Sequence, residues 1–345
     1  MRDIKELSLK ELEVKLLSWG KPGYHARQVL SWIYGKGAYE FAKMSDLPVT
    51  LRDLLTDEFY ILGLRLEDLQ RSSDGTDKFL FELKDGNLIE AVGIPAARRV
   101  TGCISSQAGC KFACSFCASG LKGFKRNLTC GEMLDEVLYL KHNLEKGQLT
   151  HIVFMGTGEP LDNYDNLLKA VRVINSPEAF NIGSRKITIS TCGIVPGIRR
   201  LQGESLQVEL SISLHAADDS LRSRIMPINR KYPLSDLIRC CREYSEKTNR
   251  QVTFEYILVK GLNSDLASAK KLSGLLSSLR LAKVNLIPAN PVNGSTEKML
   301  PPSEQEVSAF KEYLFKTGVN VTLRKERGQD IQAACGQLRL KHEKN

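Results

Sequence analysis

The stretch Cys110-Lys111-Phe112-Ala113-Cys114-Ser115-Phe116-Cys117 carries three thiols at the spacing C-x3-C-x2-C. Thiolates this close together suit an iron–sulfur cluster or a zinc ion, since both accept soft sulfur ligands. A complete cluster usually takes four cysteines, and the nearest others, Cys103 and Cys130, lie seven residues upstream and thirteen downstream. Three ligands would leave one iron open to a group that is not protein. Zinc loops normally bring paired C-x2-C knuckles, and because only one occurs here the pattern favours iron.

The same stretch resembles the cluster motif of the radical S-adenosylmethionine (SAM) superfamily. Phe116 stands directly before the last thiol, and the neighbouring residues are small: Ala113, Ser115, Ala118, Ser119 and Gly120. In that superfamily the open iron chelates the amino and carboxylate groups of SAM. The resemblance therefore implies two cofactors, SAM and one [4Fe–4S] cluster bound by Cys110, Cys114 and Cys117.

The composition is that of a globular protein in a reducing compartment. Of the 345 residues, 42% are hydrophobic and 26% are charged, and no segment approaches the apolar length needed to span a bilayer. Residues 1–6 are charged and lack the apolar core of a secretory signal. Nine cysteines are an odd number, three of them clustered, which argues against a disulfide framework. We expect a cytoplasmic protein with no membrane partner.

Positive charge is concentrated beside the cysteine motif. The chain carries a net charge of +9, and residues 91–131 contain no Asp or Glu. A basic block next to a candidate site suggests a polyanionic substrate such as nucleic acid, although a solvated surface is the plainer alternative. A target base must leave its stack to reach an active site, so a basic rim is expected above the cluster. The candidate rim segments are Arg98-Arg99, Lys122-Gly123-Phe124-Lys125-Arg126 and Arg324-Lys325-Glu326-Arg327.

The first part of the chain predicts a small helical domain over residues 1–75. Helical patterns cover residues 8–19, 24–36 and 48–59. The period then changes to alternation around Asp85-Gly86, a dipeptide typical of tight turns, which predicts a β-hairpin. We expect this hairpin, residues 76–95, to connect the helical domain to the rest of the chain. The N-terminal domain is expected to grip RNA by its shape more than by its sequence.

Strand and helix patterns alternate over residues 96–325, which predicts an α/β fold. Apolar, β-branched runs recur at residues 101–105, 151–155, 186–191, 207–214, 253–259, 283–287 and 320–323. Six or so βα units predict a parallel sheet that closes into a partial barrel. The expected fold is a partial, TIM-like (βα)6 barrel of the radical SAM type, with the helical domain and the hairpin at its N-terminal side.

Polar residues follow these predicted strands at the points where they end. In a βα barrel such positions share the carboxyl-end mouth, where active sites are built. Gly156-Thr157-Gly158-Glu159-Pro160 follows the second strand and resembles the superfamily's glycine-rich loop, which binds the SAM amino group. The expected SAM contacts are Gly158, Glu159, Ser190, Ser213, Leu214, His215 and Asn290. Taken singly, each is more often a satisfied polar or packing residue at a barrel rim.

Longer motifs make the resemblance more specific. They are Cys103-Ile104-Ser105-Ser106-Gln107, Met155-Gly156-Thr157-Gly158-Glu159-Pro160, Ser213-Leu214-His215-Ala216, Met226-Pro227-Ile228-Asn229, Val284-Asn285-Leu286-Ile287-Pro288 and Ala333-Ala334-Cys335-Gly336-Gln337-Leu338. Together they resemble the RlmN/Cfr family of radical SAM RNA methyltransferases, over essentially the whole chain. One departure is Cys192, which follows Ser190-Thr191 where relatives often carry a small residue. Because the matched SAM contact Ser190 is kept, little is put in doubt.

The family resemblance implies roles for three further residues. Carbon 2 of adenine is electrophilic, so the methyl group is first placed on a cysteine, matched here by Cys335 in the tail of residues 326–345. A second SAM supplies a 5′-deoxyadenosyl radical that activates this methyl group, so each turnover uses two SAM. Cys103 matches the thiol that releases the RNA through a transient Cys103–Cys335 disulfide. Glu90 matches the proton acceptor, and its apolar neighbours are expected to raise its pKa. Residue type and position alone would make each of the three an ordinary structural residue.

The implied substrates are adenosine 2503 of 23S rRNA and adenosine 37 of tRNAs, both methylated at carbon 2. The nearest alternative is Cfr-like methylation of carbon 8 of the same rRNA base, because the catalytic set is shared. An iron–sulfur electron carrier or RNA-binding module without chemistry, and a radical SAM enzyme acting on a protein or metabolite, are alternatives of other classes. An external electron donor such as flavodoxin or ferredoxin completes the expected partners.

Overall fold

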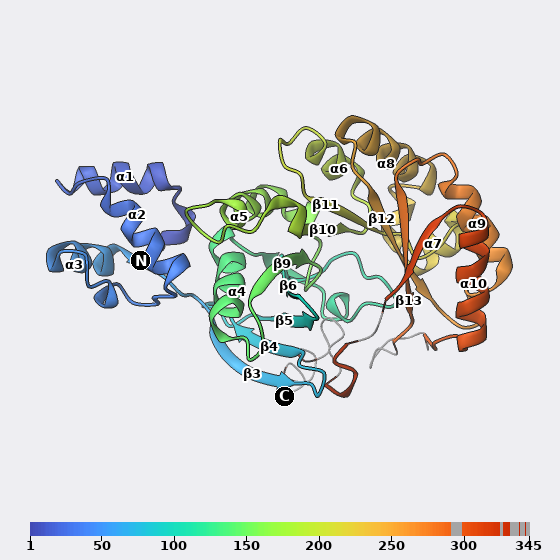
Figure 1. The fold of residues 1–345 in the computed structure, drawn as a ribbon, viewed down its shortest axis with the longest axis horizontal. Helices are drawn as coiled ribbons and strands as arrows, with labels where there is room; N and C mark the ends of the chain where they lie inside the picture. Colours follow the sequence, from blue (N-terminus) through green and yellow to red (C-terminus); the bar gives the residue numbers. More distant parts are fainter. Residues whose placement is uncertain (291–298, 325–326, 332–337, 339–341, 343–345) are drawn as a thin grey trace.

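The computed structural model describes residues 1–290, 299–324, 327–331, 338 and 342, and its central feature is a ten-stranded sheet (Figure 1). The strand order is β14-β13-β12-β11-β10-β9-β6-β5-β4-β3. Strands β6 and β9 to β14 run parallel, and β3, β4 and β5 extend the sheet antiparallel at one edge. The bounds are β3 Arg65–Arg71, β4 Asp77–Glu82, β5 Leu88–Ala96, β6 Arg99–Ile104, β9 Leu149–Phe154, β10 Ile187–Thr191, β11 Glu209–Ser213, β12 Val252–Leu258, β13 Ala282–Pro288 and β14 Asn320–Leu323.

Helices follow most parallel strands and cover one face of the sheet (Figure 1). They are α4 Cys130–Asn143, α5 Tyr164–Asn175, α6 Val195–Leu201, α7 Asp219–Ile225, α8 Leu234–Thr248, α9 Leu266–Leu276 and α10 Glu304–Lys316. The side chains that alternate toward this face are apolar and fully buried, among them Phe154, Ile189, Ile212, Phe254 and Val284. Burial of this continuous apolar layer is the main driving force that holds helices and sheet together.

These elements confirm the predicted α/β class and the predicted parallel strands to within a few residues. The hairpin at Asp85-Gly86 is also present, as β4 paired with β5. The hairpin is also part of the main sheet, because β5 pairs directly with β6. Three features were not predicted: strand β3, the short parallel pair of β1 (Arg2–Asp3) and β2 (Phe59–Tyr60), and a small sheet of β7 (Gln107–Gly109) and β8 (Phe124–Asn127) that brackets the cysteine loop.

The N-terminal residues form a lobe of short helices at one end of the molecule (Figure 1). Their bounds are α1 Leu9–Ser18, α2 His25–Leu30 and α3 Val49–Glu58, and α2 continues as a π-helical turn over Ser31–Gly35. Helix α1 begins with a capping box, in which the Ser8 hydroxyl accepts from the Glu11 N–H and the Glu11 carboxylate accepts from the Ser8 N–H. None of the helices in the described part of the chain is both long and apolar enough to cross a bilayer.

A buried ionic cluster fastens this lobe to helix α4. The Lys5 ammonium lies 2.7 Å from Asp3 and 2.9 Å from Asp135 of α4, and all three side chains are almost completely buried. Asp135 also accepts a hydrogen bond of 2.9 Å from the Gly63 N–H. Two carboxyls share one cation here, and burial raises the pKa of Asp135 to about 7.

The Asp135→Asn substitution should remove a pH dependence from the docking of the lobe. Because the folded-state pKa of Asp135 is raised above its unfolded value, its contribution to stability is present at low pH and is lost as pH rises through 7. The slope is at most about 1.4 kcal/mol per pH unit for one proton. Both tryptophans of the chain, Trp19 and Trp32, lie in this lobe, so their fluorescence during urea unfolding reports on it. Equal pH slopes between pH 4 and 7 for the variant and the parent protein would contradict this assignment.

Candidate active site at the carboxyl ends of the parallel strands

The face of the sheet opposite the helices is lined with polar side chains. Strand register places paired residues on the same face, so Val92 of β5, Cys103 of β6 and Val153 of β9 form one row across three strands. The same face continues through Ser190 and Ser211 to Ser213, Glu255 and Asn285. Glu90, two residues before Val92, also lies on it. Four residues that the sequence assigned to the site, Glu90, Cys103, Ser190 and Ser213, thus share one face.

Glu90 lies in a buried ion pair at the edge of this face. Its carboxylate is 3.1 Å from the Lys78 ammonium, with side-chain exposures of 3% for Glu90 and 0% for Lys78. The sequence analysis considered only the apolar neighbours of Glu90, and the buried Lys78 ammonium on the adjacent strand adds a cation to these surroundings. The D-G turn could have revealed this pair, because the hairpin register puts Lys78 opposite Val92, two residues from Glu90 on the same face.

Cys103 lies near the end of β6, on the neighbouring strand. Its side chain is buried, at 6% exposure, and it pairs in register with Val92. Ser105, two residues later, donates its hydroxyl to the Glu90 carbonyl at 2.8 Å. The carboxyl end of β6 is therefore tied to the backbone of the strand that carries Glu90.

The three motif cysteines lie on the single loop between β7 and β8. Glycine is required at its start, because Gly109 has a φ of +79° and a Cβ there would collide with the Gly123 carbonyl. The Cys110 N–H donates to the same carbonyl at 3.2 Å, and the Cys117 N–H donates to the Cys114 carbonyl at 3.1 Å. Hydrogen bonds between backbone groups, not between side chains, thus close the loop.

The three thiols of this loop have the chemistry expected of ligands for an iron–sulfur cluster. Burial raises the pKa of Cys110 to about 12 and that of Cys114 well above its ordinary value, and the proximity of the thiols to one another adds to both shifts. Bound iron would compensate the charge of three neighbouring thiolates. Within the described residues, no three His, Cys, Asp or Glu side chains are already positioned around one metal ion. In a [4Fe–4S] cluster each cysteine binds a different iron, so the three thiols need not surround a single metal ion.

The glycine-rich loop after β9 packs on the end of β6. The Thr157 carbonyl accepts from the N–H groups of Ser106 at 2.9 Å and Gln107 at 3.1 Å. Gly158 has a φ of +105°, and a Cβ on it would lie 2.5 Å from the Gln107 Cβ. A side chain at Gly158 would therefore disrupt the contact between the two strand ends.

The Glu159 side chain bonds to the protein backbone. One carboxylate oxygen accepts from the Cys192 N–H at 2.7 Å, and the other accepts from the Leu161 N–H at 3.1 Å. The residue is 4% exposed, and burial raises the pKa of its carboxyl. The predicted SAM contact at this position therefore has a structural function as well: it ties the end of β9 to the end of β10.

Ser190, Ser213, Leu214 and His215 lie where β10 and β11 end, as the sequence suggested. Ser190 and Ser213 are half-buried, whereas Leu214 and His215 are buried. The His215 ring packs edge-on against Phe116 of the cysteine loop, with centroids 4.5 Å apart. Burial lowers the pKa of His215 to about 3, and its Nδ1 accepts from the Ile257 N–H at 3.1 Å, so the neutral ring keeps its proton on Nε2. Asn290 follows β13 and is exposed.

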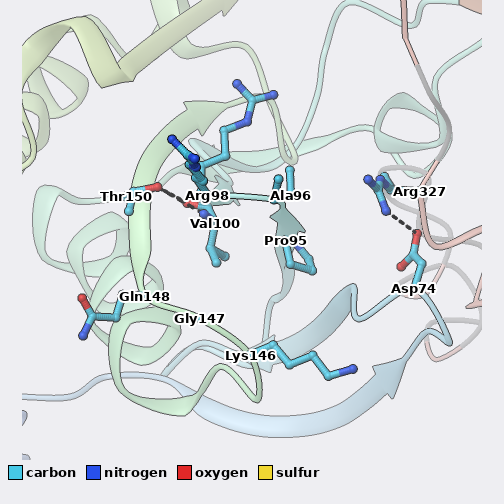
Figure 2. A pocket seen from close by; sticks show the side chains of 12 residues that line it. Asp74, Pro95, Ala96, Arg98, Val100, Lys146, Gly147, Gln148, Thr150 and Arg327 are labelled. Atoms are coloured by element: carbon cyan, nitrogen blue, oxygen red, sulfur yellow. Dashed lines mark hydrogen bonds and ion pairs between the residues drawn. The ribbon is translucent and has the colours of Figure 1, made fainter.

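The basic segments are divided between the two ends of the barrel. Lys122 and Lys125 flank the cysteine loop, and Arg324 follows β14 at its carboxyl end. Arg98 and Arg99 lie instead where β6 begins, at the other end of that strand from Cys103, because Arg98 is in the turn between β5 and β6. The prediction that Arg98-Arg99 borders the mouth is therefore wrong. Both line a separate cavity of about 570 Å³, shown in Figure 2 with Pro95, Lys146 and Asp74.

Cys335 lies outside the described residues, but the chain before it is anchored. The Asp330 carboxylate accepts from the Ser72 hydroxyl at 2.5 Å and from the Ser73 N–H at 3.0 Å. Asp74 accepts from the Gly328 N–H at 3.0 Å and lies 3.8 Å from the Arg327 guanidinium (Figure 2). The turn between β3 and β4 thus holds residues 327–331, and Cys335 follows Asp330 after four intervening residues.

Comparisons with known proteins match both parts of the chain. Residues 104–270 match the family model described as the radical SAM superfamily, and residues 2–61 match the N-terminal domain of the ribosomal RNA large subunit methyltransferase. The radical SAM superfamily implies a [4Fe–4S] cluster and SAM as cofactors.

Full-length relatives are similar over nearly the whole chain. A probable dual-specificity RNA methyltransferase RlmN of Clostridium acetobutylicum is 45% identical over 98% of this chain and 97% of its own length. One of the same description from Thermoanaerobacter pseudethanolicus is 44% identical over 99% of each chain. The crystal structure of a radical SAM methyltransferase from Sphaerobacter thermophilus superposes with a TM-score of 0.94, at 43% identity, covering 98% of this chain and 99% of that one. This chain therefore belongs to the RlmN family of radical SAM RNA methyltransferases.

Proposed function

We propose that this protein methylates carbon 2 of adenosine 2503 in 23S rRNA and carbon 2 of adenosine 37 in tRNAs. The observation that carries the proposal is the placement of Glu90 and Cys103 on adjacent strands of one polar face, beside the loop of three cysteines. Full-length similarity to proteins described as dual-specificity RNA methyltransferases supports both RNA substrates.

The [4Fe–4S] cluster, held by Cys110, Cys114 and Cys117, would supply the electron that cleaves SAM reductively. The chain's own residues would bind SAM at Gly158, Glu159, Ser190, Ser213, Leu214, His215 and Asn290. The neutral His215 ring offers an N–H donor on Nε2, and the hydroxyls of Ser190 and Ser213 offer donors and acceptors at the same strand ends. Two SAM molecules would be consumed per turnover, one to methylate Cys335 and one to activate that methyl group.

Cys335 would carry the methyl group to the adenine and Cys103 would release the product. The Cys103 thiolate would form a sulfur–sulfur bond with Cys335 while the sulfur–carbon bond breaks. The bonding electrons would stay with the carbon, which takes up a proton from solvent to become the methyl group. Glu90, whose carboxylate lies 3.1 Å from the Lys78 ammonium, would accept the proton that the adduct loses.

An external electron donor of the flavodoxin or ferredoxin class would reduce the cluster. We also infer a cytoplasmic location. The chain has nine cysteines, an odd number with three of them clustered in one loop, and this pattern is typical of a reducing compartment.

The test is an anaerobic assay of the reconstituted protein with methyl-labelled SAM and unmodified 23S rRNA or tRNA. Wild-type protein should produce 2-methyladenosine, and Cys335→Ala should produce none because it has no methyl carrier. Cys103→Ala should accumulate RNA linked covalently to the protein, visible as a retarded band that ribonuclease removes. Cys240→Ala, which removes a fully buried thiol of α8, is the matched control and should behave like the parent protein.

The methylated position is identified by mass spectrometry against standards for both isomers. Product at carbon 8 would leave the mechanism standing and favour the Cfr-like alternative. Cleavage of SAM without RNA methylation would overturn the substrate assignment but not the cluster assignment.

A further inference from the structure

Arg222 is a buried cation whose hydrogen bonds join several parts of the candidate site. It lies on helix α7 and is 0% exposed. Its guanidinium donates to the Cys192 carbonyl at 2.8 Å and to the carbonyls of Ser213 and Leu214 at 3.0 Å each. A fourth bond of 2.9 Å goes to the Asn229 side-chain oxygen. The planar guanidinium group thus holds the ends of both β10 and β11 by hydrogen bonds, and the expected SAM contacts lie at these strand ends.

These hydrogen-bond acceptors are all neutral. The nearest acidic residue on the same helix, Asp219, uses its carboxylate to accept from the Asn229 side chain and from the Leu234 N–H, each bond within 2.9 Å. Carbonyl dipoles satisfy the geometry of the guanidinium but do not neutralise its charge. Burial lowers the pKa of Arg222, although the Asp219 charge works against this by favouring the charged form. An anion in the adjacent cysteine loop would offset this cost of burial.

Helix α7 also packs against the cysteine loop. The Ser115 N–H, from the residue after Cys114, donates to the Ile225 carbonyl of α7 at 2.9 Å. Ile225 belongs to a buried apolar cluster against which Cys114, Phe116 and Leu221 also pack. Arg222 therefore lies on the helix that contacts the cluster loop, one residue after Leu221 and three before Ile225.

We infer that Arg222 is a positioning residue with an electrostatic function: it fixes the ends of β10 and β11 and supplies a fixed positive charge to the iron–sulfur and SAM site. This inference rests on the proposed function, since it assumes that a cluster of thiolate-bound iron occupies the loop. Three thiolates bring negative charge into a poorly hydrated region, and a fixed cation there favours the reduced, more negative state of the cluster. The reduction potential should consequently depend on the charge at position 222.

Three substitutions separate charge from packing. Arg222→Lys keeps the positive charge but loses the planar guanidinium with its several hydrogen-bond donors. Arg222→Gln keeps hydrogen-bond donors but loses the charge. Arg222→Met loses both the charge and the donors. Arg224→Met, two residues along the same helix and exposed, is the matched control. For each protein the measurements are iron and sulfide content, the cluster midpoint potential by spectroscopically monitored redox titration, and the dissociation constant for SAM.

We expect the Arg222→Lys potential to stay close to that of the parent protein. Arg222→Gln and Arg222→Met should shift the potential to more negative values, and SAM binding should weaken by about tenfold or more as the strand ends loosen. If Arg222→Gln loses its iron while Arg222→Lys retains it, this result would also show that the charge at position 222 supports the cluster. Equal potentials in the Lys and Gln variants, shifted or not, would overturn it.

These measurements use no RNA, so they separate this inference from the proposed function. If the parent protein methylates neither rRNA nor tRNA while the potentials still follow the charge at position 222, the proposed substrate is wrong and the assignment of Arg222 stands. If RNA methylation is normal but the reduction potentials do not depend on the charge at position 222, the proposed function stands and the assignment of Arg222 is wrong.

Discussion

Cys114→Ala should give a folded protein that holds almost no iron and cleaves no SAM. Three cysteines are the whole protein ligand set expected for the cluster, and a chain with two ligands leaves a second iron without protein support. The substitution removes one partly buried sulfur, so the fold should be nearly unaffected. The measurements are iron and sulfide per chain after anaerobic reconstitution, the visible absorption of the cluster, and SAM cleavage under a strong reductant.

Matched thiol substitutions decide whether this loss is specific. Cys110→Ala and Cys117→Ala should behave like Cys114→Ala, because all three lie on the loop between β7 and β8. Cys241→Ala, at a fully buried position of α8, should keep its iron. Normal iron content in any one of the three loop variants would show that this thiol is not a ligand.

The sequence was a good guide wherever a residue's role depends on its place along a strand. Alternating or apolar runs located the parallel strands, and polar residues at their ends marked one mouth of the barrel, because parallel strands end on the same side. That reasoning placed Ser190, Ser213 and His215 correctly at strand ends. Strand β3 escaped prediction because its segment, Arg65–Arg71, is mostly charged and exposed and lacks an apolar alternation.

Contacts between segments that are far apart along the chain could not be predicted from the sequence. Arg222 is a single arginine in a seven-residue helix, and no local pattern shows that its guanidinium reaches Cys192 and Ser213. Glu159 was assigned to SAM alone because the bond from its carboxylate to Cys192 exists only once β9 and β10 are paired. Arg98-Arg99 was assigned to the wrong end of the barrel because charge near the cysteine motif was counted along the chain, without regard to strand direction.

Lys78→Met should destabilise the protein by about 3–5 kcal/mol, the usual result of removing one partner from a buried ion pair. The Glu90 carboxylate would remain at 3% exposure without its cation at 3.1 Å. Glu90→Gln should destabilise in the same way by removing the carboxylate that lies beside the Lys78 ammonium, whereas the double variant should recover part of the loss because both charges of the pair are gone. Urea unfolding of the four proteins gives the coupling free energy directly. Glu82→Gln, in the more exposed Arg65–Glu82 pair between β3 and β4, is the control and should change stability little.

The double variant also separates the structural role of Glu90 from its catalytic role. If Glu90 accepts a proton during turnover, Lys78→Met/Glu90→Gln should be substantially folded, retain its cluster and methylate Cys335, yet yield no methylated RNA. The reason is that glutamine cannot take up the proton, whereas charge balance in the core no longer depends on it. RNA methylation by this variant near the parent rate would remove Glu90 from the mechanism. Its ion pair with Lys78 would then be purely a structural contact between β4 and β5.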